Sequence, residues 1–170
     1  MALNIIFMGT PNFAVPILKS INDSEHNILA VYTQKPKKKD RGQKINISPI
    51  HEFSNTVKLQ VRYPIKFDKK ECDFIKNLKP DVVIVVAYGK ILPSALLNFK
   101  KIKFLNIHAS LLPKWRGAAP IERAIMNLDK KTGISIMKIV PKLDSGPVMM
   151  KSEVDIFPDT NYEILSNELT

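Results

Sequence analysis

An unbroken apolar run in the middle of the chain constrains the possible folds most. Residues 81–88 read D-V-V-I-V-V-A-Y, and the run ends at Gly89. A strand with one solvated face would alternate apolar and polar residues, whereas this β-branched run is typical of a parallel strand buried on both faces of a sheet. Parallel strands are joined by crossover connections, usually helices, so the run predicts an α/β fold.

Similar patterns predict the other elements of the fold. Asn12 and Ser48 are expected to cap helices, and Thr160 with Glu163 has the spacing of a capping box. Together the elements predict a Rossmann-like open, mostly parallel twisted sheet with helices on both faces and an antiparallel edge. Besides residues 81–88, strands are predicted at residues 4–8, 27–33, 57–61, 104–108, 133–140 and 148–156, and helices at 13–21, 48–53, 69–77, 118–128 and 160–169.

Length and composition describe an ordinary globular chain. Its 170 residues, 45% of them hydrophobic, are enough for one domain with a core. The single cysteine, Cys72, excludes an internal disulfide, and the three histidines fit no metal-ligand pattern, so no metal is expected. The N-terminal apolar stretch lacks a basic region before it and is too short for a signal or membrane helix, so we expect a cytoplasmic protein without membrane attachment.

The charge of the chain points to its partners. A formal net charge of +10 favours polyanions such as RNA, although a lysine-rich composition inherited from an AT-rich genome would produce the same excess. Residues 34–49 are predicted to form a long loop without secondary structure. This loop is either a solvated surface segment or an arm that contacts phosphates. Its basic residues are Lys35, Lys37, Lys38, Lys39, Arg41 and Lys44.

The segment 104–120 carries the clearest chemical signal. It reads F-L-N-I-H-A-S-L-L-P-K-W-R-G-A-A-P, a strand followed by a stiff loop with two prolines and a glycine. Asn106 and His108 are two residues apart on the strand, so their side chains share one face of the sheet. Ligands of open α/β sheets bind beyond the carboxyl ends of strands, so the pair is a candidate active site. Taken alone, either residue would more often be structural.

The length of this motif gives it specificity. The string N-I-H-A-S-L-L-P-K-W-R-G-A-A-P-I resembles the signature of the formyltetrahydrofolate-dependent formyltransferase family, and its end resembles the branch of that family that formylates methionyl-tRNA. The first loop, F-M-G-T-P-N-F-A-V-P, resembles the same branch. That loop keeps only Gly9 of a G-x-G-x-x-G pattern, so NAD or FAD binding is not expected. Asp144, in L-D-S-G-P, falls where the family has its third catalytic residue.

The resemblance implies a function and a set of site residues. The chain would transfer the formyl group of 10-formyltetrahydrofolate to the α-amino group of methionyl initiator tRNA, as a monomer. Asn106 would stabilise the oxyanion, while His108 and Asp144 would stabilise charge and move protons. The basic loop would contact tRNA, and residues 1–170 would be the catalytic domain, stopping inside its last helix before a C-terminal tRNA-binding domain. The implied folate-binding residues are Ala87, Tyr88, Ile91, Leu92, Ser110, Leu111, Leu112 and Pro113.

Two other functions compete with this interpretation. Enzymes that formylate glycinamide ribonucleotide or nucleotide sugars share an Asn, His and Asp set on a similar fold. The basic loop and the W-R-G-A-A-P string favour tRNA as the acceptor. The third possibility is a non-enzymatic RNA-binding module, in which the three polar residues would be coincidental. Its function would survive replacement of His108, whereas that of an enzyme would not.

Overall fold

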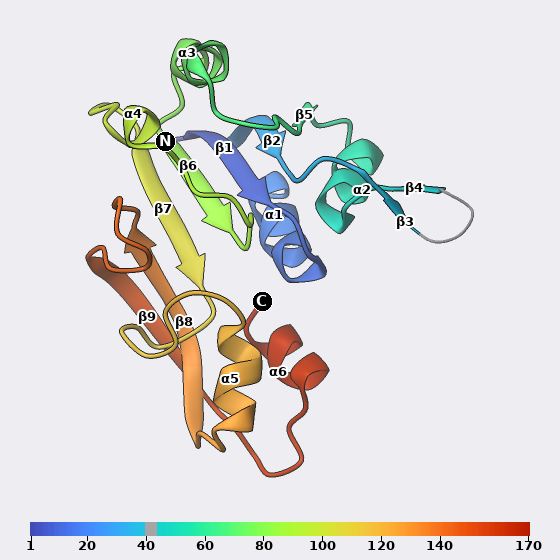
Figure 1. The fold of residues 1–170 in the computed structure, drawn as a ribbon, viewed down its shortest axis with the longest axis vertical. Coiled ribbons are helices and arrows are strands. Elements are labelled where there is room, and N and C mark those ends of the chain that lie inside the picture. The colour runs from blue at the N-terminus through green and yellow to red at the C-terminus, as the bar shows by residue number, and fades with distance from the viewer. Residues whose placement is uncertain (40–43) are drawn as a thin grey trace. The chain divides into compact units, whose positions relative to one another are not determined.

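The computed structural model describes residues 1–39 and 44–170 of the chain (Figure 1). The contacts between residues divide the chain into two compact units, Met1–Lys103 and Phe104–Thr170. No helix among the described residues is long and apolar enough to cross a membrane.

A parallel sheet forms the centre of the first unit. Its strands lie in the order β5-β2-β1-β6, and each neighbouring pair is parallel. The predicted central run becomes β6, whose residues are buried except for the half-buried Ile84. The bounds of the strands are β1 Asn4–Gly9, β2 Asn27–Tyr32, β5 Val61–Arg62 and β6 Val82–Val86.

Helices flank this sheet on both sides. Figure 1 shows α1 and α2 on one side of the strands and α3 on the other. Ser48 caps α2 as predicted, because its Oγ accepts the His51 N–H at 3.1 Å. Asn12 caps no helix: residues 12–14 form a 3-10 turn, and α1 begins only after it with no side-chain cap. The bounds are η1 Asn12–Ala14, α1 Val15–Asn22, α2 Pro49–Thr56, α3 Lys69–Leu78 and α4 Ser94–Leu97.

Two further sequence predictions in the first unit are wrong. The predicted strand at 57–61 is mostly the turn that follows α2, since Lys58 has a φ of 58° and the Leu59 N–H returns to the Ser54 carbonyl at 2.9 Å. Only Val61 remains in a strand, β5. The segment predicted as an unstructured loop contains an antiparallel pair, β3 Lys37–Lys39 with β4 Lys44–Asn46.

A buried carboxylate ties α3 to the sheet. Glu71 accepts a hydrogen bond from the Tyr32 hydroxyl at 2.6 Å and two from the Arg62 guanidinium at 2.7 Å each. The guanidinium also lies 3.8 Å from the centre of the Phe74 ring. The hydrogen bonds from Arg62 outweigh the effect of burial and lower the pKa of Glu71 below its usual value. One ionised side chain therefore joins β2, β5 and α3.

We expect Glu71→Gln to lower the free energy of unfolding by about 2 kcal/mol, because the amide cannot accept on both sides from the guanidinium. The lowered folded-state pKa means that ionised Glu71 stabilises the fold at neutral pH, and that this stabilisation is lost as the pH falls through that pKa. Urea unfolding at several pH values measures both effects. Glu52→Gln, on the exposed face of α2, is the matched control; equal stability and acid sensitivity of the two variants would contradict this account.

The second unit is an antiparallel sheet with two helices. The strand order is β7-β8-β9, and α5 packs against β8 and α6. The predicted capping box is wrong by one residue: Asn161, not Thr160, accepts the Ile164 N–H at 2.9 Å. All residues of β9 except Val154 are exposed. The bounds are β7 Lys103–His108, α5 Pro120–Met126, β8 Lys131–Lys138, β9 Val148–Asp155 and α6 Tyr162–Glu168.

These elements confirm the predicted fold class. The strands β5, β2, β1 and β6 of the first unit are parallel and connected through helices, and β7, β8 and β9 supply the antiparallel part.

Candidate active site

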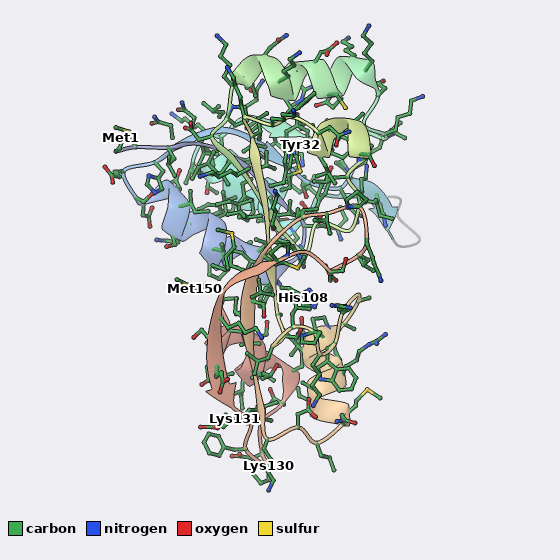
Figure 2. All side chains as sticks on the ribbon, turned by 90° about the vertical axis from the view of Figure 1, so that its left-hand side faces the viewer. Met1, Tyr32, His108, Lys130, Lys131 and Met150 are labelled. Atoms are coloured by element: carbon green, nitrogen blue, oxygen red, sulfur yellow. The ribbon has the colours of Figure 1, made fainter. Side chains whose placement is uncertain are left out.

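Strand register places His108 at the end of one row of side chains in the second unit. His108 of β7 pairs with Ser135 of β8, and Ser135 pairs with Lys151 of β9. Paired residues of neighbouring strands project from the same face of a sheet. The loop that follows His108 is held by this row. Figure 2 labels His108 where β7 ends.

The loop is held through its backbone. The Ser135 hydroxyl accepts the Leu112 N–H at 3.0 Å and donates to the Ser110 carbonyl at 2.7 Å. The Lys151 ammonium donates to the Leu112 carbonyl at 2.6 Å. The Ser110 hydroxyl closes the loop by donating to the Lys114 carbonyl at 2.6 Å. Because Ser135 and Ser110 are completely buried, these bonds are shielded from water and fix the path of the loop.

The three predicted catalytic side chains meet in this unit. The Asn106 amide donates to Asp144 Oδ1 at 3.4 Å, and His108 Nδ1 lies 3.7 Å from Asp144 Oδ2. The Gly117 N–H also donates to Asp144 Oδ2, at 2.8 Å. The side chains of His108 and Asp144 are only 8% and 10% exposed. The carboxylate therefore sits between an amide donor and an imidazole with little access to water.

A backbone carbonyl fixes the protonation of the imidazole. His108 Nε2 lies 2.9 Å from the Trp115 carbonyl oxygen. A carbonyl oxygen only accepts hydrogen bonds, so Nε2 carries a hydrogen. Nδ1 is then the ring nitrogen that gains or loses a proton, and it is the nitrogen that faces Asp144. The imidazole ring thus lies between two oxygen atoms, the Trp115 carbonyl oxygen beside Nε2 and Asp144 Oδ2 beside Nδ1.

A tight turn delivers Asp144 to the site. Asp144 has a φ of 43°, in the left-handed region that non-glycine residues rarely adopt. Two residues later, a Cβ atom on Gly146 would lie 1.8 Å from the Lys138 carbonyl oxygen, so the turn packs against the end of β8. The Lys138 N–H bonds to the Pro147 carbonyl at 2.9 Å. Glycine at 146 therefore allows the approach that positions Asp144.

We expect Gly146→Ala to lower the free energy of unfolding by about 2 kcal/mol or more, since the new methyl group must displace backbone atoms. Chemical denaturation measures the change. Ser145→Ala, in the same turn, removes only the hydroxyl that donates to the Lys142 carbonyl and serves as the control. An alanine at 146 that left stability unchanged would mean that the turn does not need this close approach.

The predicted folate-binding residues belong to both units, and several have polar groups that are already hydrogen-bonded within the protein. In the first unit, Tyr88 is 1% exposed and its carbonyl accepts from Thr10 at 2.9 Å, while burial raises the pKa of its hydroxyl. Leu92 is buried, whereas Ala87 and Ile91 are exposed. In the second unit, Ser110 and Leu112 are buried in the loop network, and Leu111 and Pro113 keep some accessible surface. Contact with a ligand through side chains is thus available at Ala87, Ile91, Leu111 and Pro113.

The predicted tRNA-contacting residues lie on the β3–β4 hairpin or just before it. Lys35 and Lys37 are exposed. Lys38 and Lys39 belong to β3 and Lys44 to β4. Arg41 lies outside the described residues. The antiparallel pair of β3 and β4, which carries Lys37, Lys38, Lys39 and Lys44, replaces part of the predicted irregular loop.

Sequence reasoning missed several groups that shape the site. Ser135 and Lys151 carry no motif, and only strand register brings them to the loop. The Trp115 carbonyl and the Gly117 N–H are backbone atoms, which leave no trace in a side-chain pattern. The glycine at position 117 was the one available signal, since glycine readily adopts a positive φ such as the 86° found there. No group of three or more potential metal ligands occurs among the described residues.

Fold and site together define a class of protein. An amide donor, an imidazole and a carboxylate in mutual reach at the end of a strand form the kind of site with which enzymes stabilise an oxyanion and transfer protons.

Comparisons with known proteins name the family. A family model described as formyl transferase matches residues 3–170. The chain is 55% identical over 172 residues to a methionyl-tRNA formyltransferase of Pelagibacter ubique, covering 100% of this chain and 56% of that protein. It is 50% identical over 158 residues to one of Rhizobium rhizogenes, covering 92% and 50%. The chain belongs to the formyl transferase family, and it spans about half the length of these curated relatives.

Solved structures support the fold. A phosphoribosylglycinamide formyltransferase from Coxiella burnetii superposes with a TM-score of 0.78 at 19% identity, covering 99% of this chain and 80% of that one. One from Bacillus halodurans superposes with a TM-score of 0.75 at 20% identity, covering 98% and 87%. At these identities the likeness concerns the fold alone.

Proposed function

We propose that this protein transfers a formyl group from 10-formyltetrahydrofolate to the α-amino group of methionyl initiator tRNA, in the cytoplasm. The observation that carries the proposal is the contact among Asn106, His108 and Asp144 in a chain of the formyl transferase family. The choice of acceptor is supported by the names of relatives that are 45–55% identical to this chain. Residues 1–170 act as its catalytic domain.

Each polar group has a role in the transfer. The Asn106 amide has two N–H groups, and the one not bonded to Asp144 is available to an oxygen atom on which negative charge develops. As the amine forms its bond to the formyl carbon, His108 Nδ1 takes up the proton that the amine loses, and it returns this proton to the folate N10 as the bond between N10 and the formyl carbon breaks. Asp144 favours the charged imidazole by its proximity and holds the ring in place. The Gly117 N–H and Asn106 keep the carboxylate oriented toward the ring.

The formyl folate supplies the carbon that is transferred. Of the residues proposed to bind it, Ala87, Ile91, Leu111 and Pro113 keep side chains that are accessible to a ligand. Tyr88, Leu92, Ser110 and Leu112 shape the two loops rather than present side chains to a ligand. No metal enters this proposal.

One assay tests reaction and acceptor together. Labelled formyl folate is offered with methionyl initiator tRNA, glycinamide ribonucleotide and a nucleotide amino sugar in parallel reactions. The proposal predicts label on the tRNA only. Label on another acceptor would leave the proposed site chemistry in place but show that tRNA is not the acceptor. No transfer to any of the three would overturn the enzymatic proposal for this chain.

The basic hairpin is proposed to contact the tRNA backbone. We expect the double variant Lys35→Ala, Lys37→Ala to weaken tRNA binding and to reduce the slope of log affinity against log salt by about 1.4 to 1.8, because about 0.7 to 0.9 counterion is released per phosphate contact. Filter binding over a salt series measures the slope. Lys100→Ala with Lys101→Ala removes the same charge from another exposed pair and should leave the slope unchanged. Equal slopes for both double variants would contradict a specific role of the hairpin.

A further inference from the structure

A chain of contacts leads from His108 to a carboxylate on the far side of the active-site loop. His108 Nε2 bonds to the Trp115 carbonyl at 2.9 Å, and the Trp115 indole Nε1–H donates to Asp129 Oδ2 at 2.7 Å. Asp129 lies between α5 and β8, in the same unit as the site. Its side chain is only 5% exposed. It does not touch the three catalytic side chains, and no motif in the sequence marks it.

The backbone of Trp115 needs to be held in place. Its φ is 57°, in the left-handed region that a residue with a Cβ adopts only at a cost. This conformation directs the Trp115 carbonyl toward the imidazole. Because the intrinsic preference of the residue works against it, contacts elsewhere must keep the peptide in this orientation. The indole is the part of Trp115 that reaches farthest from the backbone, and its single polar group, Nε1–H, is hydrogen-bonded to Asp129.

Asp129 is itself kept charged and oriented. Burial opposes ionisation, yet hydrogen bonds from Lys114, Asn127 and Trp115 outweigh it and lower the pKa of the carboxyl. The Lys114 ammonium lies 2.8 Å from Oδ1, and the Asn127 amide donates to the same oxygen at 2.6 Å. Oδ2 is left to the indole. Lys114 and Trp115 both belong to the loop, so one carboxylate anchors two consecutive loop residues.

We propose that Asp129 is a positioning residue for the transfer reaction. Its hydrogen bond to the Trp115 indole fixes the Trp115 carbonyl, and that carbonyl in turn keeps a hydrogen on His108 Nε2. His108 Nδ1 is thereby kept as the nitrogen that faces Asp144 and exchanges the proton. This inference rests on the proposed function for its effect on rate, but its effect on the imidazole is independent of any substrate.

The test combines kinetics with the tautomer of the ring. Asp129→Ala should lower kcat about ten- to a hundredfold with little change in the KM of either substrate, because a slightly misplaced catalytic group slows the reaction without loosening binding. Asp129→Asn keeps an acceptor for the indole and should recover most of the rate. Trp115→Phe, which lacks only the N–H and part of the ring, should match Asp129→Ala, and the double variant should be no slower than either. Asp155→Ala removes a carboxylate of the same unit that is 60% exposed and outside this network, and it should leave kcat unchanged.

Nitrogen-15 NMR of the His108 ring separates positioning from general stability. In the unaltered protein the neutral ring should be the Nε2–H tautomer, and in Asp129→Ala and Trp115→Phe a mixture of tautomers should appear. Unchanged ring shifts in a folded variant, or an unchanged kcat for Trp115→Phe, would overturn the proposal. Should the unaltered protein transfer no formyl group, the proposed function fails while the ring shifts still decide the role of Asp129.

Discussion

Replacing His108 by alanine is expected to slow formyl transfer by about a hundredfold to ten-thousandfold, the range that a positioned general acid or base contributes. The imidazole is the proposed proton acceptor of the site, and its Nε2 is already committed to the Trp115 carbonyl. Single-turnover transfer of labelled formyl to methionyl-tRNA measures the loss. The KM for tRNA should change little, because His108 is 7% exposed and offers almost no binding surface.

The matched control for this variant is His26→Ala. His26 lies in the first unit, between α1 and β2, where its Nδ1 accepts only the Leu3 N–H at 3.5 Å. It should keep the transfer rate of the unaltered protein. A His108→Ala protein that transferred formyl at that rate would show that the imidazole takes no part in the chemistry.

Asp144→Asn is expected to cost a hundredfold or more in transfer rate while leaving the fold intact. The amide has the size of the carboxylate and can still accept the Gly117 N–H, but it carries no charge to favour the protonated imidazole 3.7 Å away. Its new side-chain NH₂ would also face the Asn106 NH₂, and two hydrogen-bond donors cannot bond to each other. The loss should appear in kcat, measured at saturating concentrations of both substrates.

The control for Asp144→Asn is the same change at Asp155 on β9, where the carboxylate is 60% exposed. Thermal unfolding of both variants tests whether the loss is catalytic. If Asp144→Asn lost activity only in proportion to lost folded protein, the carboxylate would be a structural group of the turn.

The parts of the fold that local pattern determines were predictable. The apolar run that became β6 and the alternation that put Asn106 and His108 on one face both depend on neighbours in sequence. Asp144 was placed by its resemblance to a family motif, since nothing in its own segment marks it as close to His108. The same local reasoning failed at residues 57–61, where alternation over five residues also occurs in the turn that follows a helix. There the backbone turns back at Lys58, and tertiary packing of α2 decides the outcome.

What could not be predicted depends on register and on backbone groups. Ser135 and Lys151 hold the active-site loop only because β8 and β9 pair with β7 in one particular alignment. The hairpin formed by β3 and β4 pairs lysine-rich strands whose like charges oppose close approach, so composition favoured a loop. Asp129 shapes the site through a carbonyl of another residue, a connection that no side-chain spacing encodes.

The central claim is that His108 and Asp144 act as one unit in formyl transfer, and a double-mutant cycle tests it most directly. Single-turnover rates are measured for the unaltered protein, His108→Ala, Asp144→Asn and the double variant. If the carboxylate works through the imidazole, the double variant should be about as slow as His108→Ala alone. If the two losses instead multiply in the double variant, the residues act independently, and the contact seen between them is not the basis of catalysis.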